Sequence, residues 1–158
     1  MTAPMIVLLG NDSAALAMLH TLSATASYRT LRCRPQEVTD AHAVVKRAEA
    51  DLVILDLWAS RHEDGWAFLR HLWADLDTTH IPAIVITAEE DVLPMAVDVL
   101  RMLHCHVLRK PLDDRGLLRT IATAPGLPPA TDARRRSPPV AVFRAAQTDD
   151  SLRATGGA

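Results

Sequence analysis

The sequence has few aromatic side chains, few cysteines and no long apolar run. Aromatic residues make up 4% of the chain and hydrophobic residues 49%, so a core must be built mainly from Leu, Val, Ile and Ala. Cys33 and Cys105 each lie in a strand-like apolar segment, where a buried free thiol is commoner than a disulfide. No apolar run approaches the roughly 18 residues of a membrane span, and no signal-peptide pattern opens the chain. We therefore expect a cytoplasmic protein without a membrane partner.

The sequence also has no strong excess of positive or negative charge. The formal net charge is -2, which gives no reason to expect nucleic acid or an anionic membrane as a partner. Arg134, Arg135 and Arg136 form a small basic cluster, which is typical of a solvated segment. No glycine-rich phosphate loop of the P-loop or Rossmann kind is present, so no residues are predicted to bind an organic cofactor.

Short apolar runs alternate with amphipathic stretches over the first 125 residues or so. Apolar spacing in the amphipathic stretches predicts helices, and the continuous runs are typical of strands covered on both faces. About five such repeats predict an α/β fold, a doubly wound sheet of five parallel strands with five helices. The strands are expected at 5–10, 28–34, 51–58, 81–88 and 104–108, and the helices at 13–26, 38–48, 66–73, from 89 to about 103, and at 112–123.

Composition changes at Pro125, which divides the chain into a domain of residues 1–124 and a tail of residues 125–158. The tail is rich in Pro, Arg, Ala and Gly, and only the segment 140–143 could bury apolar side chains. Such composition is typical of a disordered tail. An arm that docks on a partner subunit remains the alternative.

Three polar residues stand at the carboxyl ends of successive predicted strands. Asp56 closes the third strand, Thr87 the fourth, and Lys110 the fifth, where Pro111 follows. Because parallel strands end at one edge of the sheet, these side chains are expected to converge on a small volume. An Asp carboxylate can attack phosphorus to form an acyl phosphate, and an ammonium and a hydroxyl can meet the transferred charge. The predicted catalytic residues are therefore Asp56, Thr87 and Lys110.

The order Asp56, Thr87-Ala88 and Lys110-Pro111 resembles the response-regulator receiver family of two-component signalling, over about residues 4–124. The resemblance implies the CheY-like, flavodoxin-like fold with strand order 2-1-3-4-5, and Asp64-Gly65 at the start of the third helix. It implies phosphotransfer to Asp56 from a sensor histidine kinase or a phosphotransfer protein. It also implies a possible homodimer through the face of the fourth helix, fifth strand and fifth helix.

The sequence departs from the family where a metal would bind. The family ends its first strand with two acidic residues that hold Mg²⁺, and here those positions are Gly10 and Asn11, with Asp12 next. The predicted metal ligands are therefore Asn11, Asp12, Asp56 and the carbonyl of Trp58. Because one carboxylate at least is missing, Mg²⁺ is expected to bind weakly. Gly10→Asp with Asn11→Asp is expected to strengthen Mg²⁺ binding and to lower the melting temperature without metal.

Further departures keep a second hypothesis open. Val107 stands where the family often has Tyr or Phe, and Leu103 stands where it commonly has Gly. The chain is therefore either a receiver in a phosphorelay or a phosphorylation-independent pseudo-receiver, a module for protein contacts. In either case it is not expected to be an enzyme, beyond self-catalysed phosphotransfer and dephosphorylation at Asp56. An unrelated flavodoxin-like enzyme is the third alternative, against which the missing cofactor motif counts.

Overall fold

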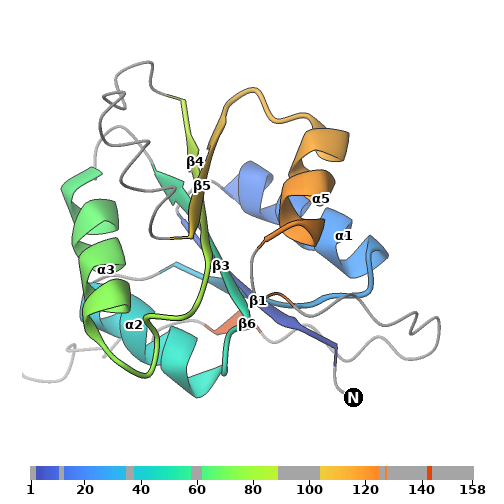
Figure 1. The fold of residues 1–158 in the computed structure, drawn as a ribbon. Helices are drawn as coiled ribbons and strands as arrows, with labels where there is room; N and C mark the ends of the chain where they lie inside the picture. Colours follow the sequence, from blue (N-terminus) through green and yellow to red (C-terminus); the bar gives the residue numbers. More distant parts are fainter. Residues whose placement is uncertain are drawn as a thin grey trace, which may run out of the picture.

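The computed structural model gives one sheet covered by helices on both faces (Figure 1). It describes the greater part of the first 124 residues and three residues of the tail. The described residues are 3–10, 13–34, 38–57, 62–88, 104–124, 127 and 142–143.

All strand pairs of the sheet are parallel. The strand order is β5-β4-β3-β1-β2-β6, so the predicted order 2-1-3-4-5 is confirmed, and a sixth strand adds beside β2. The predicted runs fall on the observed strands within about two residues at each end. The strands are β1 (Met5–Leu9), β2 (Arg29–Cys33), β3 (Leu52–Leu57), β4 (Ala83–Thr87), β5 (Cys105–Arg109) and β6 (Val142–Phe143).

Strand β6 comes from the tail. Val142 pairs with Arg32 and Phe143 with Cys33, so the tail returns to the sheet and lies along the carboxyl half of β2. The segment 140–143 was the only part of the tail expected to bury apolar side chains, but its place in the sheet was not predicted. The division of the chain at residue 124 stays a prediction.

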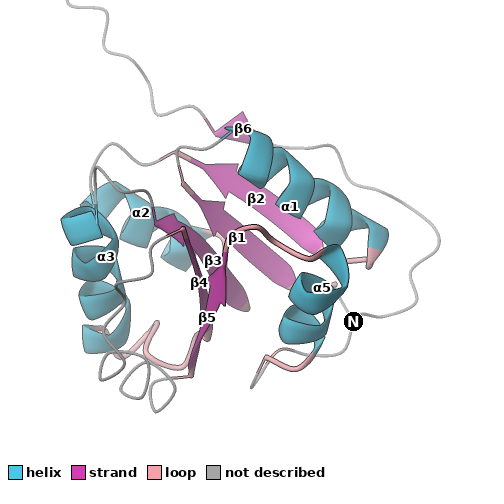
Figure 2. Cartoon of the chain, turned by 90° about the horizontal axis from the view of Figure 1, so that it is seen from above, coloured by secondary structure: helices cyan, strands magenta, loops and turns pink. Residues whose placement is uncertain are grey.

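Helices cover the two faces of the sheet as separate layers, with α1 and α5 on one side and α2 and α3 on the other (Figure 2). Alternate residues of β1, β3 and β4 feed the two cores: in β1, Ile6 and Leu8 face α1 and α5, whereas Val7 and Leu9 face α2 and α3. This is why the strands read as continuous apolar runs. The described helices are α1 (Ser13–Thr25), α2 (Val38–Arg47), α3 (His62–Ala74) and α5 (Asp114–Ala122).

Two helix starts differ from the sequence prediction. Helix α3 begins at His62, so the predicted start at residue 66 is wrong, and Gly65 is a buried helical residue. Gly65 is tolerated because helix packing overrides its poor intrinsic propensity. Helix α5 begins after Asp113, whose carboxylate accepts the backbone N–H groups of Arg115 and Gly116 as an N-cap. The predicted fourth helix, from residue 89 to about 103, lies outside the described residues.

Both cysteines are free and buried, on strands β2 and β5. Burial raises the pKa of Cys105 to about 12. Burial and the negative charge of Asp40 raise the pKa of Cys33. Both thiols are therefore protonated, unreactive core residues at neutral pH. Among the described helices, none is long and apolar enough to cross a membrane.

Candidate functional site

Asp56 lies near the carboxyl end of β3, between β1 and β4 in the sheet. Four buried apolar residues precede it in the strand, so the strand crosses the core before it reaches Asp56. Its side chain is 1% exposed. A carboxylate at this depth needs a nearby cation or hydrogen-bond donors to remain charged.

Lys110 supplies that cation. Its Nζ lies 2.9 Å from Oδ1 of Asp56, and its side chain is 24% exposed. Lys110 follows β5, which is two strands away from β3, so about 10 Å separates the two main chains at the usual strand spacing. Only a long side chain bridges that gap, and the sequence prediction that Asp56 and Lys110 converge is confirmed. The Lys110–Pro111 peptide bond is cis.

Thr87 is the last residue of β4 and lies between these two strands in the sheet. It pairs with Leu57 on β3 and with Arg109 on β5, and it is buried. Its carbonyl accepts the N–H of Lys110 at 2.9 Å. The three predicted catalytic residues therefore occupy adjoining strand ends, with the Thr87 main chain tied directly to Lys110.

Gly10 lies beside Asp56 at the end of the neighbouring strand β1. It follows β1, and its N–H donates to the carbonyl of Cys33 at 3.3 Å, so the main chain continues along the sheet. A Cβ atom on Gly10 would lie 2.9 Å from Cβ of Asp56 and 3.7 Å from its Oδ2. Sequence reasoning treated Gly10 only as a missing metal ligand. The structure shows in addition that a side chain there would require the main chain of β1 or β3 to shift.

The described residues include only part of the predicted Mg²⁺ site. Asp56 is the one predicted ligand among them, and an ammonium group already lies against its Oδ1. Within the described ranges, no group of three or more His, Cys, Asp or Glu side chains could hold a metal. The remaining predicted ligands, Asn11, Asp12 and Trp58, lie outside the described residues. Weak Mg²⁺ binding therefore stays a prediction.

Solved structures of receiver domains share this architecture. The chemotaxis response regulator CheY4 of Vibrio cholerae is 18% identical, with a TM-score of 0.65 over 78% of this chain and 99% of that chain. The receiver domain of a histidine kinase from Syntrophus aciditrophicus is 21% identical, with a TM-score of 0.64 over 89% and 100% of the two chains. The N-terminal domain of a response regulator receiver protein from Methanoculleus marisnigri is 20% identical, with a TM-score of 0.58 over 75% and 93%.

This chain has the fold of a response-regulator receiver domain. No family model and no curated protein matches the sequence, so the similarity is one of structure. Within the receiver fold, the ion pair of Asp56 and Lys110 stands at the carboxyl edge of the sheet, where open α/β sheets form their sites. Val107 on β5 is half-buried and packs against the core formed with α2 and α3.

Proposed function

We propose that this chain is a receiver-type signalling domain in which Asp56 accepts a phosphoryl group from a phosphohistidine of a sensor kinase or phosphotransfer protein. The observation that carries the proposal is the 2.9 Å ion pair of Asp56 and Lys110 at the strand ends of a receiver fold. A carboxylate oxygen forms the new O–P bond while the P–N bond of the donor breaks, and the imidazole leaves with the electron pair. No enzymatic activity is proposed beyond this transfer and the later hydrolysis of the acyl phosphate.

Lys110 has two parts in the proposed transfer. Before it, the ammonium holds the buried carboxylate in its charged, nucleophilic form. During it, negative charge spreads over the oxygens of the phosphoryl group, and an ammonium beside the acceptor oxygen stabilises that charge. Thr87 supplies a hydroxyl donor from the neighbouring strand. Because the Thr87 carbonyl binds the Lys110 N–H at 2.9 Å, a movement of either residue is passed to β5.

The output of the proposed domain is a change in protein contacts. Strand β5 is an outer strand of the sheet, and the chain runs from it directly into Lys110 and then α5. A change at Lys110 is therefore carried to the surface next to this strand, which is where the possible homodimer or another partner would bind. The fourth helix of that face lies outside the described residues.

Incubation with acetyl phosphate, followed by intact mass, tests the proposal. The wild-type chain is expected to gain the mass of one phosphoryl group, and Asp56→Asn to gain none. Asp77→Asn removes an exposed carboxylate at the other edge of the sheet and is expected to label like the wild type. Labelling that persists in Asp56→Asn would place the acceptor elsewhere.

Gly10 favours a second candidate, the phosphorylation-independent pseudo-receiver. Glycine in place of an acid, at a position where a side chain would press on Asp56, is expected of a domain whose output depends on partner binding alone. In that case no label appears on Asp56, and phosphoryl donors leave partner binding unchanged.

A further inference from the structure

The end of β1 lies unusually close to the acceptor residue. Leu9 pairs with Leu55 in the β1–β3 ladder, so Gly10 and Asp56 come next in register. The 2.9 Å separation from a built Cβ is measured to Cβ of Asp56, an atom fixed by the main chain. Rotation of a side chain cannot relieve such a contact, so a residue other than glycine requires β1 or β3 to move.

Both strands resist that movement. Strand β3 lies between β1 and β4, and β1 lies between β3 and β2. The Gly10 N–H is itself held by the Cys33 carbonyl. A carboxylate at position 10 would therefore require one of these two strands to shift.

A cation is nevertheless present beside Asp56. The Lys110 ammonium lies within hydrogen-bond distance of Oδ1, and three quarters of its side chain is shielded from solvent. Coulomb attraction at such a distance is several times stronger in a partly buried site than in water. Lys110 thus provides a positive charge at the acceptor oxygen from the chain itself.

We infer that Lys110 replaces a resident divalent cation at this site, so that phosphoryl acceptance by Asp56 does not depend on Mg²⁺. The inference rests on the proposed function of Asp56 as acceptor. With acetyl phosphate as donor, an Asp56 oxygen forms the O–P bond, and the P–O bond to the acetyl group breaks. Acetate leaves with the electron pair. The Lys110 ammonium keeps its proton and moves from the carboxylate to the phosphoryl oxygens.

The test compares labelling by acetyl phosphate in excess Mg²⁺ and in EDTA, read by intact mass over time. Equal rates are expected, whereas loss of a cation that stabilises the transferred charge would slow labelling on the order of a hundredfold. A parallel titration with Mn²⁺, in which free Mn²⁺ is counted by electron paramagnetic resonance, is expected to show no binding that Asp56→Asn abolishes.

Lysine variants test whether Lys110 is the cation that assists labelling of Asp56. Lys110→Met is expected to lose labelling in EDTA, with Lys110→Arg retaining part of it. Lys46→Met removes an ammonium from the opposite edge of the sheet and is expected to label at the wild-type rate. The wild-type comparison needs no variant, so a misfolded Lys110→Met leaves the test intact.

The remaining results distinguish failure of the inference from failure of the proposed function. Labelling that requires Mg²⁺, or Mn²⁺ binding that depends on Asp56, overturns the inference and leaves the proposed function standing. An absence of labelling both with Mg²⁺ and with EDTA overturns the proposed function, and the inference with it.

Discussion

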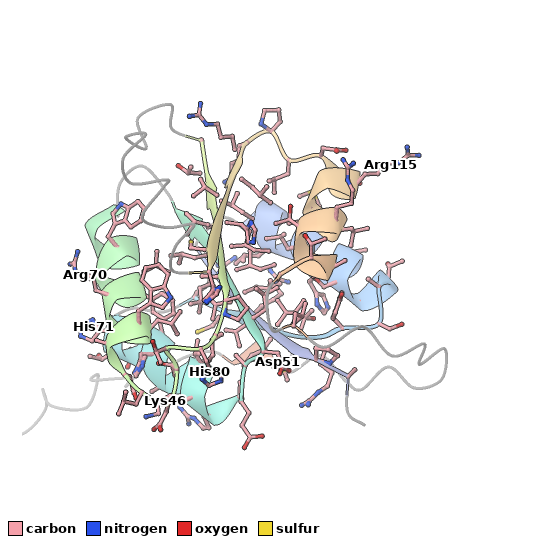
Figure 3. The ribbon with its side chains drawn as sticks, viewed as in Figure 1. Lys46, Asp51, Arg70, His71, His80 and Arg115 are labelled. Carbon is pink, nitrogen blue, oxygen red and sulfur yellow. The ribbon has the colours of Figure 1, made fainter. Side chains whose placement is uncertain are left out.

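Charged side chains are arranged in opposite ways at the two ends of the strands, which are called here the carboxyl edge and the amino edge of the sheet. At the carboxyl edge, one carboxylate with a 1% exposed side chain is held against Lys110, and Gly10 crowds it from the other side. At the amino edge, a polar network joins α2 to the turn after α3. Lys46 belongs to this network. Figure 3 shows it in the lower part of the view with Asp51 and His80, away from the carboxyl end of β4.

The amino-edge network spreads its charge over several exposed contacts. Lys46 Nζ lies 2.9 Å from Oδ2 of Asp75 and 2.8 Å from Oδ2 of Asp77. His42 Nε2 lies 3.3 Å from Oδ2 of Asp75 and 3.2 Å from Oγ1 of Thr78. The amino edge therefore fastens elements together, whereas the carboxyl edge keeps a charge buried where a reactant can meet it.

The largest expected effect comes from breaking the buried pair. Lys110→Met leaves the Asp56 carboxylate buried without that counter-charge, and we expect the free energy of unfolding to fall by about 3 kcal/mol. Adding Asp56→Asn is expected to restore part of the loss, because the double variant no longer buries a charge. Urea unfolding of the two single variants and the double variant measures the coupling.

The amino edge supplies the control for this cycle. Lys46→Met makes the same chemical change in an exposed ion pair and is expected to lose far less stability. Equal losses for the two lysine variants, or additive effects of Asp56→Asn and Lys110→Met, would remove the contrast between the edges.

Gly10 gives the next largest effect. Gly10→Ala puts a Cβ atom 2.9 Å from Cβ of Asp56, and overpacking of this kind is expected to cost about 1–3 kcal/mol. Gly10→Asp is expected to cost at least as much, since it also brings like charge to Asp56. The expectation that Gly10→Asp with Asn11→Asp strengthens Mg²⁺ binding stays a prediction, and the first of the two acids requires β1 or β3 to shift. Asn11→Asp alone avoids the contact.

Gly116 is the matched glycine control in urea unfolding. Its built Cβ atom would lie 3.1 Å from Oδ2 of Asp113, the far end of a side chain that can move. Gly116→Ala is therefore expected to be neutral or to gain up to about 1 kcal/mol from helix propensity. A harmless Gly10→Ala would show that β1 and β3 adjust easily, and would weaken the spatial argument for metal independence.

The sheet could be predicted from the sequence because its signal is local. A continuous apolar run such as 52–55 reports burial on both faces, and the polar residue that ends it, Asp56, marks the strand terminus. Convergence of Asp56 with Lys110 then followed from the parallel topology alone. Ordinary side-chain periodicity was enough for α2 and α5.

What could not be predicted depends on distances between segments. The crowding of Gly10 against Asp56 is set by the register of β1 and β3, although a glycine directly after a buried strand is a usable signal of close backbone approach. The pairing of β6 with β2 joins positions more than 100 residues apart through only two residues. The amino-edge network was missed because His42, Lys46 and Asp75 are ordinary surface residues until the helices are placed.

Thr78 tests the amino edge at a smaller scale. Its buried hydroxyl donates to the Leu72 carbonyl at 2.7 Å and lies 3.2 Å from His42 Nε2. Thr78→Val keeps the shape but leaves that carbonyl without this donor, and the expected loss is about 1–2 kcal/mol in urea unfolding. Thr78→Ser should recover part of it, and Thr79→Val, at an exposed neighbour, should change little. A neutral Thr78→Val would mean that the hydroxyl contributes nothing to this edge.

The smallest expected effect is the pH dependence of the amino-edge network. The hydrogen bond from Lys46 lowers the pKa of Asp75, helped by the Asp77 N–H and the nearby His42. A carboxyl group whose pKa is lower in the folded chain stabilises it above the ordinary value of 3.8, and this contribution is lost as the pH falls through the folded value. The hydrogen bonds that Lys46 donates to Asp77 and Asp75 likewise raise the pKa of Lys46, so that contribution is lost only as the pH rises above 10.5. We therefore expect the stability difference between the wild type and Asp75→Asn to shrink as the pH falls below the ordinary carboxyl value, measured by urea unfolding at each pH. Glu49→Gln changes the net charge equally without touching these contacts. If its acid profile matched that of Asp75→Asn, the effect would come from net charge, and the amino edge would not owe its acid sensitivity to this network.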